Sequence, residues 1–166
     1  MTDELLHIDQ KIIEILKTVS DPEIPVLSIV DMGVVRAAKM NNDVVEVQIT
    51  PTYSGCPAMD VIGDDIISAF NQNGLKAKVE LVLSPAWTTD WITPKGRAAL
   101  EKYGIASPLS ADADKEALLG NKKIVKCPQC GSLNTKLVSQ FGSTACKALF
   151  QCDDCLEPFD YFKCLK

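Results

Sequence analysis

The chain has 166 residues, of which 46% are hydrophobic and 23% charged, as is typical of a globular protein. Its net charge is −5, with −8 in residues 1–120 and +3 in residues 121–166. An acidic main body argues against general nucleic-acid binding, and no apolar run approaches the roughly 18 residues that a membrane span needs. Because the start of the chain lacks the pattern of a secretory signal, we expect a cytoplasmic protein with reduced cysteines.

The first 105 residues have the pattern of one small α+β domain. Apolar residues three and four positions apart predict a helix over residues 4–19, which Asp21-Pro22 ends. The only histidine, His7, falls off the apolar stripe of this helix and is expected to be solvated. The elements that follow are a hairpin of strands 33–39 and 44–50, a helix from Pro57 to Asn73-Gly74, a strand over 78–83, and a helix from Thr93-Pro94 to Gly104.

The last third of the chain differs in pattern from the first domain. Residues 106–123 have little apolar periodicity and are predicted to be a linker. Strand-like stretches at 135–141, 147–151 and 159–164 then predict a zinc-ribbon-like β domain over residues 124–166. About 45 residues bury too little apolar surface to fold reliably unaided, so bound metal would supply much of the stability.

Two CxxC pairs are the strongest chemical signal in the chain. Cys127 and Cys130 form the first pair, and Cys152 and Cys155 form the second. This spacing brings four thiolates to one tetrahedral metal site, whereas disulfide pairing is disfavoured in a reducing compartment. Zn(II) is the preferred ion because closed four-cysteine sites are mostly structural, and a single iron is the alternative.

Two further cysteines in the tail leave this assignment open. Cys146 and Cys164 lie outside the CxxC pairs. Soft thiolates attract soft metals, so a different set of four among the six tail cysteines could bind an iron–sulfur cluster. The simpler interpretation, which we favour, is that both are packed thiols.

Cys56 is the candidate site residue of the first domain. If the helix begins at Pro57, this cysteine is the N-cap, where free amides and the helix dipole lower the pKa of a thiol. Such a thiolate can bind a metal or attack an electrophile, although a small buried apolar residue is the alternative. The hydroxyls of Thr52 and Ser54 lie close in sequence.

Two other residues are weaker candidates. Glu23 stands between Pro22 and Pro25, which would hold its carboxylate in a defined direction, although a rigid connector explains the pattern equally well. Trp87 lies in a predicted loop and offers a docking surface, whereas burial over the sheet is the commoner fate of tryptophan.

Four motifs give the first domain a family resemblance. Residues 21–26 (Asp-Pro-Glu-Ile-Pro-Val), 31–35 (Asp-Met-Gly-Val-Val), 54–57 (Ser-Gly-Cys-Pro) and 84–88 (Ser-Pro-Ala-Trp-Thr) occur in the order found in the MIP18-type family. That family is implicated in iron–sulfur cluster assembly. The resemblance implies a compact domain in which Cys56 is the candidate ligand of a transient iron or iron–sulfur cluster.

The tail extends the resemblance to nearly the whole chain. Residues 140–149 and 157–164 are similar to the D-component family of multicomponent phenylacetyl-CoA epoxidase systems. This resemblance implies a non-catalytic accessory subunit in aerobic phenylacetate breakdown, which assists metal-centre or cluster assembly in the oxygenase or the reductase. Those proteins are the expected partners, and a homo-oligomer stays open.

Two other functions are kept as alternatives. In the first, tail cysteines bind iron and carry electrons to the oxygenase. In the second, the ribbon binds nucleic acid, for which a charge of +3 over residues 121–166 is thin support.

Overall fold

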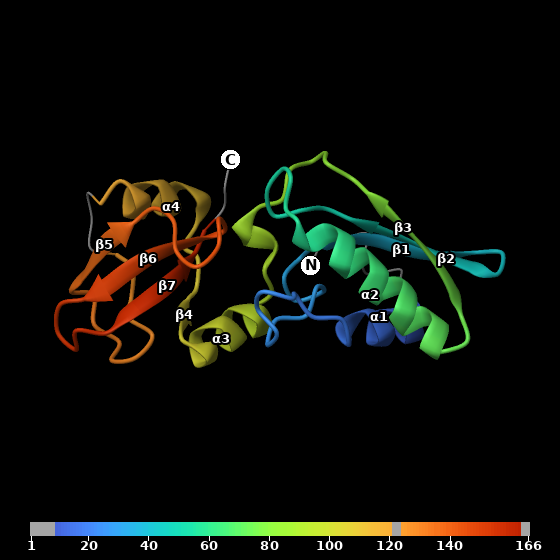
Figure 1. Cartoon of the computed structure of the whole chain (residues 1–166), viewed down its shortest axis with the longest axis horizontal. Helices are drawn as coiled ribbons and strands as arrows, with labels where there is room; N and C mark the ends of the chain where they lie inside the picture. Colours follow the sequence, from blue (N-terminus) through green and yellow to red (C-terminus); the bar gives the residue numbers. More distant parts are fainter. Residues whose placement is uncertain (1–8, 121–123, 164–166) are drawn as a thin grey trace. The chain divides into compact units, whose positions relative to one another are not determined.

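The computed structural model describes residues 9–120 and 124–163 (Figure 1). The chain divides into two compact units, Met1–Trp87 with Trp91–Gly96, and Thr88–Asp90 with Arg97–Lys166. Within the described residues, no helix is both long and apolar enough to cross a membrane.

The first unit has the predicted order of helix, hairpin, helix, strand and helix. Its elements are α1 (Gln10–Lys17), β1 (Val35–Asn41), β2 (Val44–Ile49), α2 (Ala58–Gln72), β3 (Lys76–Leu81) and the start of α3 (Pro94–Tyr103). The short helix η2 (Thr89–Trp91) is divided between the units, since Thr89 and Asp90 belong to the second and Trp91 to the first. The predicted start of the first helix at residue 4, and with it His7, lies outside the described residues. The predicted α+β class is confirmed.

The sheet of this unit has the strand order β1-β2-β3. The hairpin strands β1 and β2 are antiparallel, whereas β3 pairs with β2 in parallel, from Val44↔Lys76 to Ile49↔Leu81. Helices α1 and α2 lie along one face (Figure 1), where Ile62, Ile66 and Phe70 are buried. Because α2 connects two parallel strands, its first turn lies at the end of the sheet where β2 and β3 finish.

Trp87 is part of the core of this unit. Its side chain is 2% exposed, and Nε1 donates a hydrogen bond to the Met32 carbonyl oxygen at 3.1 Å. A buried ring with its polar atom satisfied offers no surface to a partner. The docking role predicted for Trp87 is therefore wrong, and the packing alternative is correct.

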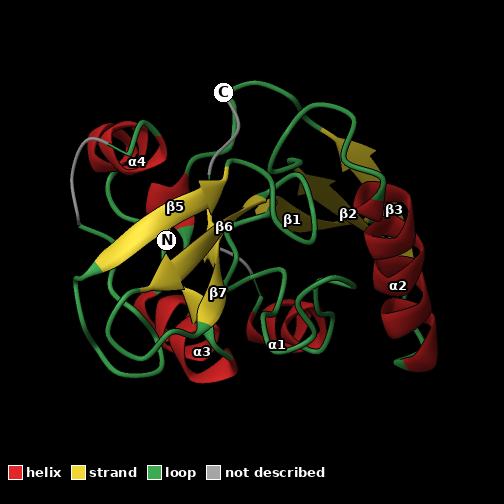
Figure 2. Cartoon of the chain, turned by 60° about the vertical axis from the view of Figure 1, so that its left-hand side comes forward, coloured by secondary structure: helices red, strands yellow, loops and turns green. Residues whose placement is uncertain are grey.

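The second unit contains a four-stranded sheet with the order β4-β7-β6-β5. Its elements are the end of α3, then β4 (Ile105–Ala106), α4 (Ala111–Leu118), β5 (Thr135–Ser139), β6 (Lys147–Cys152) and β7 (Pro158–Phe162). Helix α4 lies beside the sheet (Figure 2). The three predicted ribbon strands are present with small shifts of their ends.

The segment predicted as a linker contains regular structure. Strand β4 pairs in parallel with β7, and α4 buries Ala117 in the ribbon core. Asp114 of α4 is also buried, accepts a hydrogen bond from the hydroxyl of Tyr161 on β7, and accepts another at 3.5 Å from Thr89. Polar pairing with a partner 47 residues away leaves no periodic signal in the sequence, which is why the pattern of 106–123 did not predict it.

Candidate functional site

Cys127, Cys130, Cys152 and Cys155 form one group in the ribbon. Their Sγ atoms all lie within 4.8 Å of one another, with 3.7 Å between Cys127 and Cys155 and 3.6 Å between Cys130 and Cys152. Four sulfurs bound at about 2.3 Å to a tetrahedral zinc ion lie about 3.8 Å apart. The residues present therefore fit a Zn(II) ion with four thiolate ligands.

The two CxxC turns have the same backbone design. Cys127 N–H donates to the Ser132 carbonyl at 2.9 Å, and Cys152 N–H donates to the Glu157 carbonyl at 3.0 Å. Each turn needs a left-handed residue directly after its second cysteine, and these are Gly131 with φ 76° and Leu156 with φ 65°. Glycine adopts this conformation without strain, whereas leucine does so at a cost.

Backbone amides point at the sulfurs of these turns. The amides of Cys155 and Asp154 donate to Cys152 and lower the pKa of its thiol to about 7. Hydrogen bonds to the charged form stabilise a thiolate, which is the form that binds metal. The ribbon fold thus prepares Cys152 as a ligand.

Polar side chains fasten one CxxC turn to the other, which the sequence did not reveal. Asp154 accepts hydrogen bonds from Ser132 at 2.5 Å and from Asn134 at 2.7 Å, and the neighbouring Asp153 pairs with Lys136 at 2.8 Å. Such partners hold metal ligands in position. The two aspartates between Cys152 and Cys155 were the available signal, but their partners lie about 20 residues earlier.

Cys146 does not join the four-cysteine group of the described residues. It is buried, and its Sγ lies 3.1 Å from the hydroxyl oxygen of Thr144. This placement matches the packed-thiol interpretation. Cys164 lies outside the described residues.

Cys56 lies directly before α2, one residue further from the helix than predicted. Pro57 is the N-cap, and Cys56 is half-buried after the left-handed Gly55. Burial raises the pKa of the Cys56 thiol, and this effect outweighs the hydrogen bonds from the Ala58 amide and the Tyr53 hydroxyl. The expected N-cap position is off by one residue, and the expected low pKa is wrong because burial of the thiol outweighs the hydrogen bond from the Ala58 amide.

The structure brings the Glu23 loop close to Cys56. The negative charges of Glu23 and Asp21 both act on the Cys56 thiol and raise its pKa further. The Asp21 carboxylate accepts from the amides of Glu23 at 2.8 Å and Ile24 at 2.9 Å, which fixes the loop. The Asp21 carboxylate thus adds to the two prolines as a constraint on the backbone of this loop.

The hydroxyl residues near Cys56 differ in exposure. Thr52 is buried, whereas Ser54 is exposed. Thr50, at the end of β2, is buried, and its Oγ1 has no hydrogen-bond partner among the described residues. Tyr53, which sequence reasoning did not select, is the hydroxyl that contacts Cys56.

Comparisons with known proteins agree with this division of the chain. Residues 9–81 match the family model described as "Iron-sulfur cluster assembly protein", and residues 111–163 match the "PaaD zinc beta ribbon domain". A solved domain of unknown function (DUF59) from Bacillus anthracis has a TM-score of 0.51 at 26% identity, and the match covers 54% of this chain and 88% of that one. The fold and the four-cysteine group define an assembly-type domain joined to a zinc ribbon.

Two curated relatives show more specifically which protein family the chain belongs to. An Escherichia coli (strain K12) protein, provisionally named as the D component of 1,2-phenylacetyl-CoA epoxidase, is 49% identical over 91% of this chain and 90% of its own length. An Fe-S protein maturation auxiliary factor of Porphyromonas gingivalis is 33% identical over 60% of this chain and 97% of its own. The chain belongs to the family of D components of 1,2-phenylacetyl-CoA epoxidase, which confirms the resemblance found in the sequence.

Proposed function

We propose that this protein is a non-catalytic maturation subunit of a phenylacetyl-CoA epoxidase system in aerobic phenylacetate breakdown. It assists assembly of a metal centre or iron–sulfur cluster in the oxygenase or the reductase, which are its clients. The observation that carries the proposal is the pairing, in one chain, of an iron–sulfur assembly domain with a four-cysteine ribbon.

The two cysteine sites have different roles in this proposal. The ribbon cysteines hold Zn(II), which would cross-link two turns and stabilise a small β fold. Cys56 is exposed enough to meet a partner and is the ligand offered to transient iron or a cluster, with Glu23, Thr52 and Ser54 as supporting residues. Cys56 is the only cysteine in residues 1–126, so this domain by itself offers a single thiolate.

The domain roles follow the same division. Residues 1–105 act on the metal centre, and residues 124–166 form the ribbon that contacts the other epoxidase components. Reduced thiols at all four ribbon positions suit the cytoplasm, where we place the protein.

The test is gene replacement in a host that grows on phenylacetate. We expect deletion to lower the iron content and activity of purified oxygenase or reductase, and the wild-type gene to restore both. Cys56→Ser should fail to restore them, whereas Asp43→Ala, an exposed change in the β1–β2 turn at the opposite end of the sheet, should succeed. Full cofactor occupancy in the deletion strain would overturn the proposal.

Metal analysis separates this function from an electron carrier. We expect anaerobically purified protein to be colourless and to contain zinc, which Cys152→Ser loses and Cys56→Ser keeps. Iron with visible absorption that disappears in Cys152→Ser would favour the carrier instead.

A further inference from the structure

The segments that reach the Cys56 end of the first unit are rich in acids. Residues 18–35, 50–65 and 81–94 contain no Lys or Arg. Arg36, at the start of β1, is a cation at this end, and its guanidinium lies over the Trp91 ring. On α2, Asp60 and Asp64 are both exposed and lie one helical turn apart. Glu23 and Asp21 add negative charge close to the thiol.

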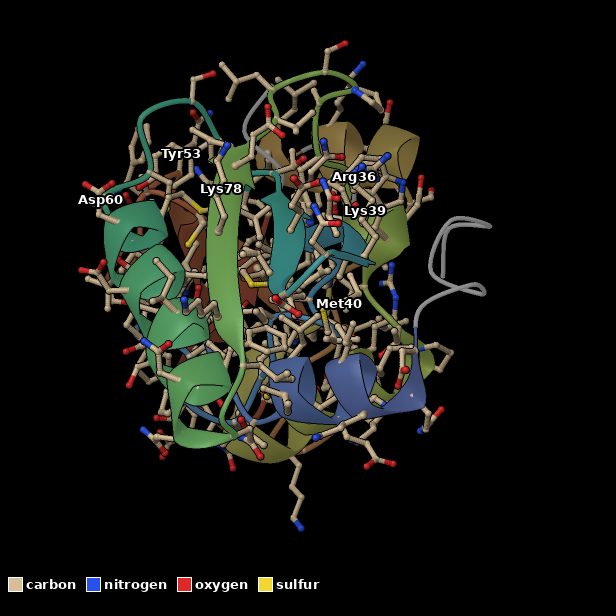
Figure 3. All side chains as sticks on the ribbon, turned by 90° about the vertical axis from the view of Figure 1, so that its right-hand side faces the viewer. Arg36, Lys39, Met40, Tyr53, Asp60 and Lys78 are labelled. Atoms are coloured by element: carbon tan, nitrogen blue, oxygen red, sulfur yellow. The ribbon has the colours of Figure 1, made fainter. Side chains whose placement is uncertain are left out.

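Exposed apolar side chains occur at the same end. Val61 of α2 is 48% exposed, Leu81 at the end of β3 is 52% exposed, and Leu83 just beyond it is 61% exposed. They share this position because β3 finishes where α2 begins, and Figure 3 shows Tyr53 and Asp60 at that end of α2, level with the arrowhead of β3. We define the Cys56 face as Cys56, Asp60, Val61, Asp64, Leu81 and Leu83.

Apolar residues inside a charged rim are the usual composition of a protein-binding surface. We infer that the Cys56 face docks a client protein surface that presents apolar side chains within a rim of Lys and Arg. This inference rests on the proposed function, because it supplies the contact by which Cys56 would reach the metal centre of the client. What the inference adds to the proposed function is the surface chemistry of the client, namely apolar side chains within a rim of Lys and Arg.

The negative charge of the Cys56 face favours a basic client protein over two other partners, a second copy of the chain and nucleic acid. A second copy of the chain docked through the same face would place Asp60 and Asp64 against acids of its partner, and juxtaposed like charges cost several kcal/mol. Nucleic acid would meet the same repulsion. A basic protein surface instead gains faster association and a defined orientation.

The test measures binding of the full-length, metal-loaded protein to purified epoxidase oxygenase subcomplex and, separately, to the reductase. We expect Asp60→Lys with Asp64→Lys to weaken binding to one of them about tenfold or more at low ionic strength, and to reduce the salt dependence of the wild-type affinity. Asp43→Lys is the control, since it makes the same change at an exposed position in the β1–β2 turn, at the opposite end of the sheet.

The outcomes separate this inference from the proposed function. Cys56→Ser should bind the client as tightly as wild type while failing in maturation, because docking uses the surrounding face. Equal weakening by the control and the double variant, or none in either, would overturn the docking inference even if maturation depends on Cys56. Self-association through this face, seen as dimers that Asp60→Lys abolishes, would also overturn it.

Discussion

Leu156 occupies a backbone position that suits glycine. Its φ of 65° is equivalent to the φ of 76° at Gly131 in the other CxxC turn, yet it carries a side chain that is 68% exposed. A left-handed non-glycine residue costs roughly 1–2 kcal/mol. Because the exposed leucine side chain gains little free energy by burial, the backbone strain at Leu156 is not offset. The other CxxC turn has Gly131 at this position and avoids the strain.

We therefore expect Leu156→Gly to stabilise the zinc-loaded ribbon by about 1 kcal/mol. The measurement is chemical unfolding of the metal-loaded protein, with Gly131→Ala as the opposite change, which should destabilise by about 1 kcal/mol. A destabilising Leu156→Gly would mean that the leucine side chain makes a contact worth more than the strain.

At the scale of elements, Asp31 joins the loop before β1 to the start of α3. Its carboxylate accepts hydrogen bonds from Ser28 at 2.9 Å and Thr93 at 2.8 Å, and Lys95 pairs with it at 3.4 Å. Burial by itself raises the pKa of Asp31, but the hydrogen bonds from Thr93 and Ser28 and the charge of Lys95 lower it below its ordinary value of 3.8. The exposed Lys95 contributes the least to stability, because solvent screens it.

This arrangement predicts a pH-dependent stability. With a folded-state pKa below the unfolded-state value, Asp31 contributes stability that is present above about pH 4 and is lost as the pH falls through the folded-state pKa. Asp31→Asn should cost about 2 kcal/mol at pH 7 and progressively less below pH 4. Urea unfolding followed at several pH values measures this, and parallel profiles for the two proteins would contradict it.

Elements were predicted well where a local rule governs them. The cap at Thr93 is an example, since its hydroxyl oxygen accepts from the Gly96 amide at 3.0 Å as a residue before Pro94 suggests. The start of α2 was displaced by one residue because proline is compatible with the position before a helix as well as with its first turn. That single shift removed Cys56 from the N-cap.

At the scale of the whole molecule, the two units depend on metal to different extents. The first unit has a core of aliphatic and aromatic side chains around α2, whereas the ribbon core includes two of the metal-binding cysteines, Cys127 and Cys152. Removing a structural zinc removes folding free energy from the domain that binds it. When a chelator is present, the first unit should therefore stay folded under conditions in which the ribbon unfolds.

Both tryptophans, Trp87 and Trp91, belong to the first unit, so their fluorescence reports on that unit. We expect a zinc chelator to shift the unfolding midpoint measured by circular dichroism while the midpoint measured by tryptophan fluorescence stays nearly constant. Cys152→Ser without chelator should behave in the same way. An equal shift of both midpoints would show that the metal stabilises the two units together.

The sequence by itself determined the element order of the first unit, the three ribbon strands, the four-cysteine metal site and the family, because each depends on local periodicity, fixed spacing or short motifs. Only the tertiary structure decided the parallel pairing of β3, the burial of Trp87, the helix within residues 106–123 and the raised pKa of Cys56. Each of these depends on residues far apart in the chain that exclude water from one another. Burial and long-range pairing arise only when the chain is folded, and no spacing within the sequence encodes them.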